Sequence, residues 1–160
     1  MRYDGTDKCD DFICNTLIDH FDLIPVCPEV GAGLGTPRPP VRLVGNPEYP
    51  QALGVDDADL NVTAALEAFA KRWLEQLENI SGLILKARSP SCGLRDTPVF
   101  DHDGDIQVLE AGLFTRILMS HAPLLPMVDE VDINNLERRA DFIAGVKAYN
   151  TQSVRSPMRK

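Results

Sequence analysis

The sequence lacks any apolar stretch that approaches membrane-spanning length, and its N-terminus, Met-Arg-Tyr-Asp-Gly, does not have the pattern of a signal peptide. Both absences favour a cytoplasmic protein without a membrane partner. Positive charge is also scarce, because 16 lysines and arginines stand against 24 aspartates and glutamates, a formal net charge of −8. Nucleic-acid binding rests on neutralising phosphates, so this chain alone is a poor candidate for tight binding of nucleic acid. Small molecules remain open as ligands.

The sequence has no Cys-x-x-Cys pair, so a zinc ribbon is not indicated. It has only four cysteines, at positions 9, 14, 27 and 92, and a reducing compartment favours metal binding or catalysis for them over a disulfide framework. The acidic stretch 101–105 lacks the full spacing and the terminal Glu of a calcium loop and is interpreted as a tight turn. Internal repeats are absent. With 160 residues, 44% hydrophobic and 25% charged, the chain has the size and composition of one globular domain.

The richest chemistry lies in residues 86–93, Lys-Ala-Arg-Ser-Pro-Ser-Cys-Gly. This stretch follows a short apolar run that predicts a buried strand, and its proline and glycine predict a turn. A thiol, two hydroxyls and two cations are therefore expected at the carboxyl end of a strand, where ligands gather in open α/β sheets. The charge of Lys86 or Arg88 is expected to lower the pKa of the Cys92 thiol and to favour the thiolate.

A second apolar run, residues 22–27, ends in the same way, with Cys27 followed by a proline and Glu29. Two cysteines at strand ends could face one another at a common edge, and we expect a shared site, although each cysteine taken alone could be a small buried hydrophobe. The long loop 31–60 carries Arg38 and Arg42. These arginines could hold an anionic or carbonyl-bearing ligand, or they could be solvated surface residues.

Helical periodicity predicts helices over about 8–21, 61–79 and 109–121, and a last helix that starts near Asp132. The strand expected at 82–86 follows a helix, an order typical of a parallel sheet, and residues 124–128 are the next strand candidate. We therefore expect an α/β fold of three layers, a mainly parallel sheet with flanking helices.

Five motifs occur in order along the chain: Arg-Tyr-Asp-Gly at 2–5, Pro-Val-Cys-Pro-Glu-Val at 25–30, Thr-Pro-Arg-Pro at 36–39, Val-Arg-Leu-Val at 41–44 and Leu-Lys-Ala-Arg-Ser-Pro-Ser-Cys-Gly at 85–93. In this order they resemble the domain-of-unknown-function family 523, which includes the thiouracil desulfidases, over roughly residues 2–126. The resemblance implies an α/β fold that holds an oxygen-sensitive 4Fe–4S cluster by three cysteines, with the fourth iron open to the sulfur of a thiolated uracil.

Carried onto this chain, the resemblance makes Cys27 and Cys92 two cluster ligands, Glu29 the acid/base and Ser89 its assisting hydroxyl. Only the family motif favours Ser89 over Ser91 as the hydroxyl that faces the site. We expect the substrate to be bound by four further side chains, those of Arg38, Arg42, Lys86 and Ser91.

The implied reaction is a non-redox hydrolysis of the C–S bond of a thiolated uracil base or nucleotide, which releases sulfide. An iron with an open position is a Lewis acid, and a carboxylate two residues from a ligand could activate water. A metal-free alternative is Cys92 acting as a nucleophile activated by Lys86 or Arg88. No histidine base lies near Cys92 in the sequence, which disfavours this alternative.

Members of the family begin with a strand that ends in a Ser-Ala-Cys-Leu-Leu-Gly type of motif directly before Arg-Tyr-Asp-Gly, and this cysteine is the third ligand. In this chain Met1 directly precedes Arg2, so this first strand is expected to be missing. Either the start site is assigned too late or the gene is trimmed, or the chain is a non-catalytic remnant without a working cluster. Cys9 or Cys14 could in principle replace the ligand. The loss of a central strand would expose sheet edges and apolar surface.

The C-terminal part resembles the junction into a second domain, which is found in two-domain relatives that desulfurate 4-thiouridine in transfer RNA. We therefore expect residues 1–126 to form an iron–sulfur desulfidase-like domain, and residues 127–160 to form a linker helix with a frayed tail. Such a helix would expose an unpaired apolar face. The chain could be a fragment of such a desulfidase, and transfer RNA would be a partner only with the missing domain.

Overall fold

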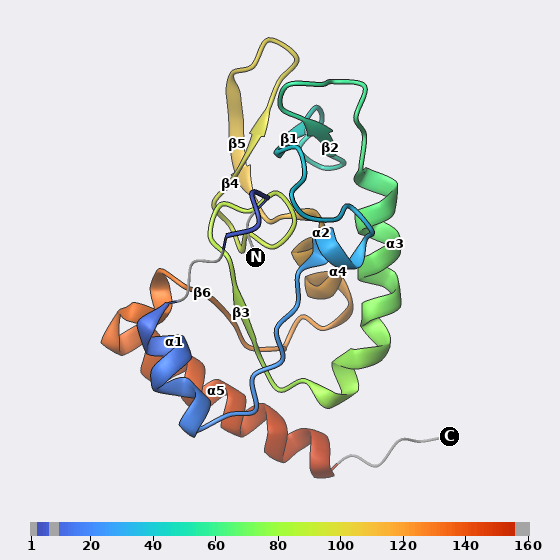
Figure 1. Cartoon of the computed structure of the whole chain (residues 1–160). Helices are drawn as coiled ribbons and strands as arrows, with labels where there is room; N and C mark the ends of the chain where they lie inside the picture. The colour runs from blue at the N-terminus through green and yellow to red at the C-terminus, as the bar shows by residue number, and fades with distance from the viewer. Residues whose placement is uncertain (1–2, 7–9, 156–160) are drawn as a thin grey trace.

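The computed structural model describes residues 3–6 and 10–155 (Figure 1). This part of the chain contains six strands together with helices, of which the short 3-10 helices are labelled η. In chain order the elements are α1 (Asp11–Asn15), η1 (Leu17–Asp19), α2 (Pro28–Gly31), β1 (Val41–Val44), β2 (Gln51–Gly54), α3 (Thr63–Trp73), η2 (Leu74–Asn79), β3 (Leu83–Leu85), β4 (Thr97–Phe100), β5 (Ile106–Glu110), α4 (Leu113–His121), β6 (Met127–Asp129), η3 (Asp132–Asn134) and α5 (Leu136–Arg155).

The strands form two sheets. The larger sheet has the order β2-β1-β4-β5, with β1 parallel to β4 and both outer pairs antiparallel, and β3 pairs with β6 in parallel. The α/β class with flanking helices is confirmed, and the larger sheet is mixed rather than purely parallel. The antiparallel pairs arise because short connections join β1 to β2 and β4 to β5 as hairpins. The acidic stretch 101–105 is the second hairpin turn, in which Asp101 accepts hydrogen bonds from the amides of Asp103 and Asp105.

The first part of the core lies between the larger sheet and two helices. Leu43 and Val99 of the sheet are fully buried against Leu66 of α3. Further along the same helix, Phe69 and Trp73 contact Phe114 of α4, with ring centroids 5.8 and 5.4 Å apart. These contacts hold α3 and α4 together, and α4 in turn begins beside the loop that follows β3.

The second part of the core covers the β3–β6 sheet. Leu17, Val128 and Ile133 are buried together with Phe142 and Val146 of α5. The apolar face that we expected α5 to expose is therefore covered by the strands and by η1. Among the described residues, no helix combines the length and the apolar character needed to cross a membrane.

The predicted strand 22–27 is not a strand in the structure. The segment is extended, but it joins neither sheet and, among the described residues, no hydrogen bond involves the backbone of residues 22–26. Its apolar side chains are correspondingly open: Leu23, Ile24 and Val26 are 37%, 64% and 38% exposed. An apolar run becomes a strand only when a neighbouring strand takes its backbone groups, and this condition is not met here.

Candidate active site

A cavity of about 360 Å³ lies where the end of segment 22–27 meets α2, the following loop and the loop after β3. Six of the eight predicted site residues line this cavity: Cys27, Glu29, Arg38, Lys86, Ser89 and Cys92. Pro39, Pro40 and Val26 contribute apolar surface to its wall. The structure thus brings together Cys27 and Cys92, which are 65 residues apart in the sequence.

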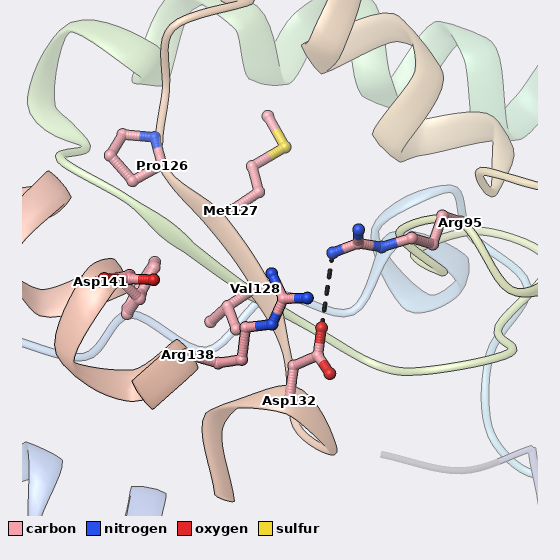
Figure 2. Close-up of a pocket in the computed structure, with 8 residues that line it drawn as sticks. Arg95, Pro126, Met127, Val128, Asp132, Arg138 and Asp141 are labelled. Atoms are coloured by element: carbon pink, nitrogen blue, oxygen red, sulfur yellow. Dashed lines mark hydrogen bonds and ion pairs between the residues drawn. The ribbon is translucent and has the colours of Figure 1, made fainter. Parts of the chain in front are cut away.

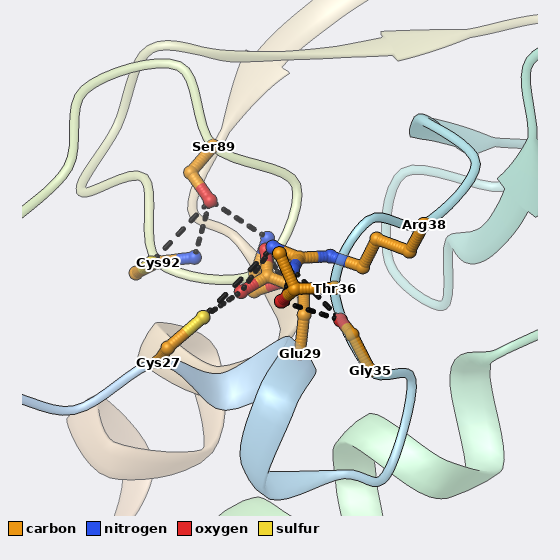
Figure 3. Close-up of polar contacts among 8 residues, drawn as sticks. Cys27, Glu29, Gly35, Thr36, Arg38, Ser89 and Cys92 are labelled. Carbon is orange, nitrogen blue, oxygen red and sulfur yellow. Dashed lines mark hydrogen bonds and ion pairs between the residues drawn. The ribbon is translucent and has the colours of Figure 1, made fainter. Parts of the chain in front are cut away.

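Glu29 is the centre of the polar contacts, as Figure 3 shows. It lies in the first turn of α2, which begins at Pro28 directly after Cys27, and it is only 8% exposed. The Cys27 thiol donates to Glu29 Oε2 at 3.3 Å, and Arg38 Nη2 lies 3.7 Å from the same oxygen. On the other side, Ser91 Oγ donates to Oε1 at 2.6 Å. A buried carboxylate with three polar partners has a fixed orientation toward the thiol.

Ser89 and Cys92 form the opposite wall. Ser89 Oγ lies 3.3 Å from Cys92 Sγ and accepts a hydrogen bond from the Cys92 amide at 3.2 Å. The turn is tight, since the amide of Gly93 donates to the Ser89 carbonyl at 2.8 Å. A Cβ atom on Gly93 would lie 1.9 Å from Thr97 Oγ1, so only glycine fits at this position. Ser89 is therefore the hydroxyl beside the thiol, while Ser91 is fully buried behind it and holds Glu29.

The N-terminus of α4 is hydrogen-bonded to this loop. The amides of Leu113 and Phe114 donate to the carbonyls of Pro90 and Ser91, both at 2.9 Å. A Cβ atom on Gly112 would come within 2.4 Å of the Ser91 carbonyl group, so the helix start can approach the loop only because Gly112 has no side chain.

The expected lowering of the thiol pKa is wrong. Burial raises the pKa of Cys92 from 9.0 to about 12, and the negative charge of Glu29 adds to the increase. The hydrogen bond from Ser89 acts in the opposite direction. The two cations that we expected to act on the thiol are directed elsewhere, because the Lys86 ammonium pairs with Glu130 and Arg88 is exposed. Cys92 is a protonated thiol at neutral pH, and this disfavours the metal-free nucleophile.

Arg42 does not line the cavity. Its guanidinium lies over the ring of Phe100, 5.2 Å from the centroid, on the larger sheet. Cys14 is exposed in α1, which packs through Phe12 and Ile13 against the second part of the core, and it does not line the cavity either. Cys9 lies outside the described residues. Within residues 3–6 and 10–155, no three His, Cys, Asp or Glu side chains are grouped so that they could hold a metal ion.

A second cavity, of about 240 Å³, lies between β6, α5 and the loop after Cys92 (Figure 2). Arg95 and Asp132 form an ion pair at its edge, 3.4 Å between Nη2 and Oδ2. Neither Cys27 nor Cys92 lines it, so it lacks the thiols of the larger cavity.

Sequence reasoning missed Tyr3 in the larger site, and it missed Glu130, which contacts two residues that line this site. Tyr3 lines the cavity, and its carbonyl accepts a hydrogen bond from the Arg38 amide at 2.8 Å. Glu130 pairs with Lys86 and accepts from the Ala87 amide. The signal for Glu130 was its place close after the strand predicted at 124–128, since Cys27 and Cys92 were also expected at the ends of strands.

The fold and the cavity define an α/β protein in which two thiols, a buried carboxylate and a hydroxyl converge at one site. Residues 1–130 match the 2-thiouracil desulfurase family, and the chain belongs to this family. Its fold is similar to that of the [4Fe-4S]-dependent thiouracil desulfidase TudS, with a TM-score of 0.62, 26% identity, and 87% of this chain and 88% of the other covered.

In sequence, the chain is similar to the uncharacterized protein YbbK of Bacillus subtilis (strain 168), with 31% identity over 101 residues. This match spans 58% of the chain and 64% of the relative's length. The resemblance found in the five sequence motifs is thus confirmed at the level of the family and the fold.

Proposed function

We propose that this chain catalyses the non-redox hydrolysis of the C–S bond in a thiolated uracil base or nucleotide, with uracil and sulfide as products. The observation that carries the proposal is the convergence of Cys27, Glu29, Ser89 and Cys92 on one cavity. The family and the similarity to a thiouracil desulfidase support the same reaction class. A cavity of about 360 Å³ with apolar walls suits a ligand of the size of a pyrimidine.

The donor set fits a 4Fe–4S cluster in kind, because thiolates are the usual ligands of such clusters. It falls short in number, because two thiols line the cavity and the described residues contain no group of three side chains that could hold a metal ion. Cys27 and Cys92 would hold the cluster, and its third ligand would come from outside the described residues. Once bound, the cluster supplies a Lewis-acidic iron for the substrate sulfur.

The side chains of the cavity would do the proton chemistry. Glu29 Oε2 would take a proton from the water that attacks the C–S carbon, and the same carboxyl would return it to the leaving sulfur. Arg38 holds this oxygen from one side and Ser91 holds the other oxygen, so that the carboxylate keeps its direction during the transfer. Ser89 Oγ, beside Cys92 Sγ, would donate a hydrogen bond to negative charge that develops on sulfur.

A second candidate is a non-catalytic member of the family that keeps the fold without a working cluster. The observation that favours it is the number of thiols, two in the cavity where a cluster with one open iron requires three. Under both proposals the chain acts in the cytoplasm, and transfer RNA would be a substrate only together with a further, basic domain.

The test is anaerobic reconstitution of the 160-residue chain with iron and sulfide, followed by analysis of bound iron and acid-labile sulfide. The loaded protein is then given 2-thiouracil, 4-thiouracil and thiolated transfer RNA, and sulfide release is measured. A bound cluster and release from a thiouracil support the desulfidase, with the exposed Glu48→Gln as the control and Cys92→Ser as the variant that loses the cluster. A fully loaded protein that releases sulfide from none of these substrates contradicts it.

A further inference from the structure

Glu130 lies directly after β6, and its backbone is held on both sides. Its amide donates to the Leu85 carbonyl at 3.0 Å, and its own carbonyl accepts from Asn134 Nδ2 at 2.9 Å. The β3–β6 ladder is thereby extended by one residue, to the point where β3 continues into the loop of Ser89 and Cys92. The Glu130 side chain therefore leaves the sheet beside the beginning of that loop.

The two carboxylate oxygens of Glu130 have different partners. Oε2 accepts from the Ala87 amide at 2.5 Å, and Oε1 pairs with the Lys86 ammonium. The Glu130 side chain is 19% exposed, whereas that of Lys86 is 47% exposed. Hydrogen bonds to a carboxylate are stronger than those between neutral groups, and this one acts on a backbone amide of a buried residue. The backbone of Ala87, the second residue of the loop, is therefore fixed by a side chain that directly follows β6.

The next residue is held in the same manner. The Arg88 amide donates to Asp96 Oδ1 at 2.8 Å, and Arg88 has φ +58°, in the left-handed region that non-glycine residues seldom adopt. Such a conformation persists only where the surroundings enforce it. Two carboxylates on consecutive amides do so here, and the turn that results carries Ser89 and Cys92 into the cavity.

We propose that Glu130 is a positioning residue of the active site: through the Ala87 amide it sets the conformation of the loop that carries Ser89 and Cys92, and through Lys86 it fixes a cation at the edge of the cavity. The part of this inference that concerns catalysis rests on the proposed function. The part that concerns the loop does not, because it follows from the contacts alone.

The loop is tested by amide hydrogen exchange of the metal-free protein, measured by NMR and referred to buried amides of α4. Glu130→Ala removes both contacts, and exchange at Ala87 and Arg88 is expected to rise at least about tenfold relative to that reference. Glu130→Gln keeps a carbonyl oxygen for the Ala87 amide, so exchange there stays within about threefold of the unaltered protein. Lys86→Met removes the ion pair and keeps the contact between Glu130 and the Ala87 amide, so this exchange should stay unchanged. Exchange at Ala87 that does not respond to Glu130→Ala overturns the proposal.

Activity provides the second test, with Glu137→Gln, which removes an exposed carboxylate from α5, as the control of equal charge. Glu130→Ala is expected to lower kcat for thiouracil at least about tenfold, since the reacting groups lose their alignment. Glu130→Gln is expected to retain most of kcat and to change KM, because Lys86 is released. A Glu130→Gln variant as slow as Glu130→Ala overturns the positioning role. If the unaltered, cluster-loaded protein shows no turnover while the exchange pattern holds, the proposed function fails and the loop assignment stands.

Discussion

The two walls of the cavity differ in how their polypeptide is held. On one side, β3 pairs with β6 over three residues, Leu85 is 5% exposed, and the loop that follows is fixed by Glu130, Asp96 and α4. On the other side, segment 22–27 runs to Cys27 without joining a sheet, and Ile24 is 64% exposed. The sequence patterns of the two segments are nearly the same, an apolar run closed by a proline-flanked cysteine motif. The sequence pattern therefore indicates that a segment can form a strand. Whether it does so depends on a neighbouring strand that pairs with its backbone, as β6 pairs with β3.

The two walls also contribute different functional groups to the cavity. The exposed segment delivers Cys27 and, through the first turn of α2, the carboxylate of Glu29. The loop after β3 carries Cys92 and the hydroxyl of Ser89. Its conformation is defined by Arg88, which has a positive φ, and by the carboxylates of Glu130 and Asp96. Substitutions in β3 and the loop after it should accordingly lower the free energy of unfolding and misalign the reacting groups. Substitutions in segment 22–26 should have little effect on either.

The largest effect is expected for the reacting carboxylate itself. Glu29→Gln keeps the shape of the side chain and removes its basicity, so kcat of the cluster-loaded protein should fall by about 10²- to 10⁴-fold. Sulfide release from a thiouracil measures this, and circular dichroism shows whether the fold persists. The exposed Glu48 serves as the control, since Glu48→Gln should leave kcat unchanged. An unaffected Glu29→Gln variant would remove the carboxylate from the reaction.

The thiol of the β3 wall should react slowly in the metal-free protein. Because the pKa of Cys92 is raised to about 12, the thiolate is the minor form over the whole neutral range. Alkylation by iodoacetamide at neutral pH should be about a thousandfold slower than for a thiol of pKa 9, and it should accelerate about tenfold per pH unit as the pH rises. Mass spectrometry of the modified peptide gives the rate. A plateau already near pH 8 would contradict the raised pKa.

The core residue of β3 should be far more sensitive than its counterpart in the exposed segment. Leu85→Ala removes a buried side chain and leaves a cavity, so the free energy of unfolding should fall by about 2–5 kcal/mol. Urea unfolding at neutral pH measures this loss. A loss below about 1 kcal/mol would mean that β3 is no better packed than segment 22–27.

The turn beneath Cys92 should resist even one added methyl group. In Gly93→Ala the new Cβ meets Thr97 Oγ1 and the Ser89 carbonyl, and the unfolding free energy should fall by about 1–3 kcal/mol. Gly145→Ala is the matched control, because its Cβ would lie at least 3.5 Å from every neighbour, in the middle of α5. This control should gain up to about 1 kcal/mol from the better helix former. Equal effects of the two substitutions would argue against the tight turn.

The smallest effect is expected in the exposed segment. Ile24→Ser replaces a side chain that is 64% exposed, and the unfolding free energy should change by no more than about 0.5 kcal/mol. The same urea titration as for Leu85→Ala gives the comparison directly. A loss approaching that of Leu85→Ala would show that Ile24 is buried in solution, and hence that this segment is covered by another strand.

The groups that converge on the cavity could be predicted because Cys27 and Cys92 each follow an apolar run and belong to recognisable motifs. The contacts of Glu130 and Asp96 could not be predicted, since they depend on the directions in which the backbone amides of Ala87 and Arg88 point in the folded loop. The direction of the Cys92 pKa shift also required the structure: sequence proximity to Lys86 favoured a decrease, whereas burial decides the increase. The place of the Arg42 side chain also could not be predicted from the sequence. Arg42 lies only four residues after Arg38, but its guanidinium lies over the ring of Phe100 and not in the cavity.

The place of Glu130 in the chain also sets an order of events during synthesis. Ribosomes add about 5–20 residues per second, so β6 and Glu130 emerge roughly 2–8 s after Cys92. Until then the segment that becomes β3 has no parallel neighbour, and nothing holds the Ala87 amide in its final direction. The thiols of the nascent chain are therefore accessible to oxidants and to free metal ions for seconds before their cavity exists. A cell that makes this protein has a reason to shield these thiols until residue 130 has been translated, and to load the site only afterwards.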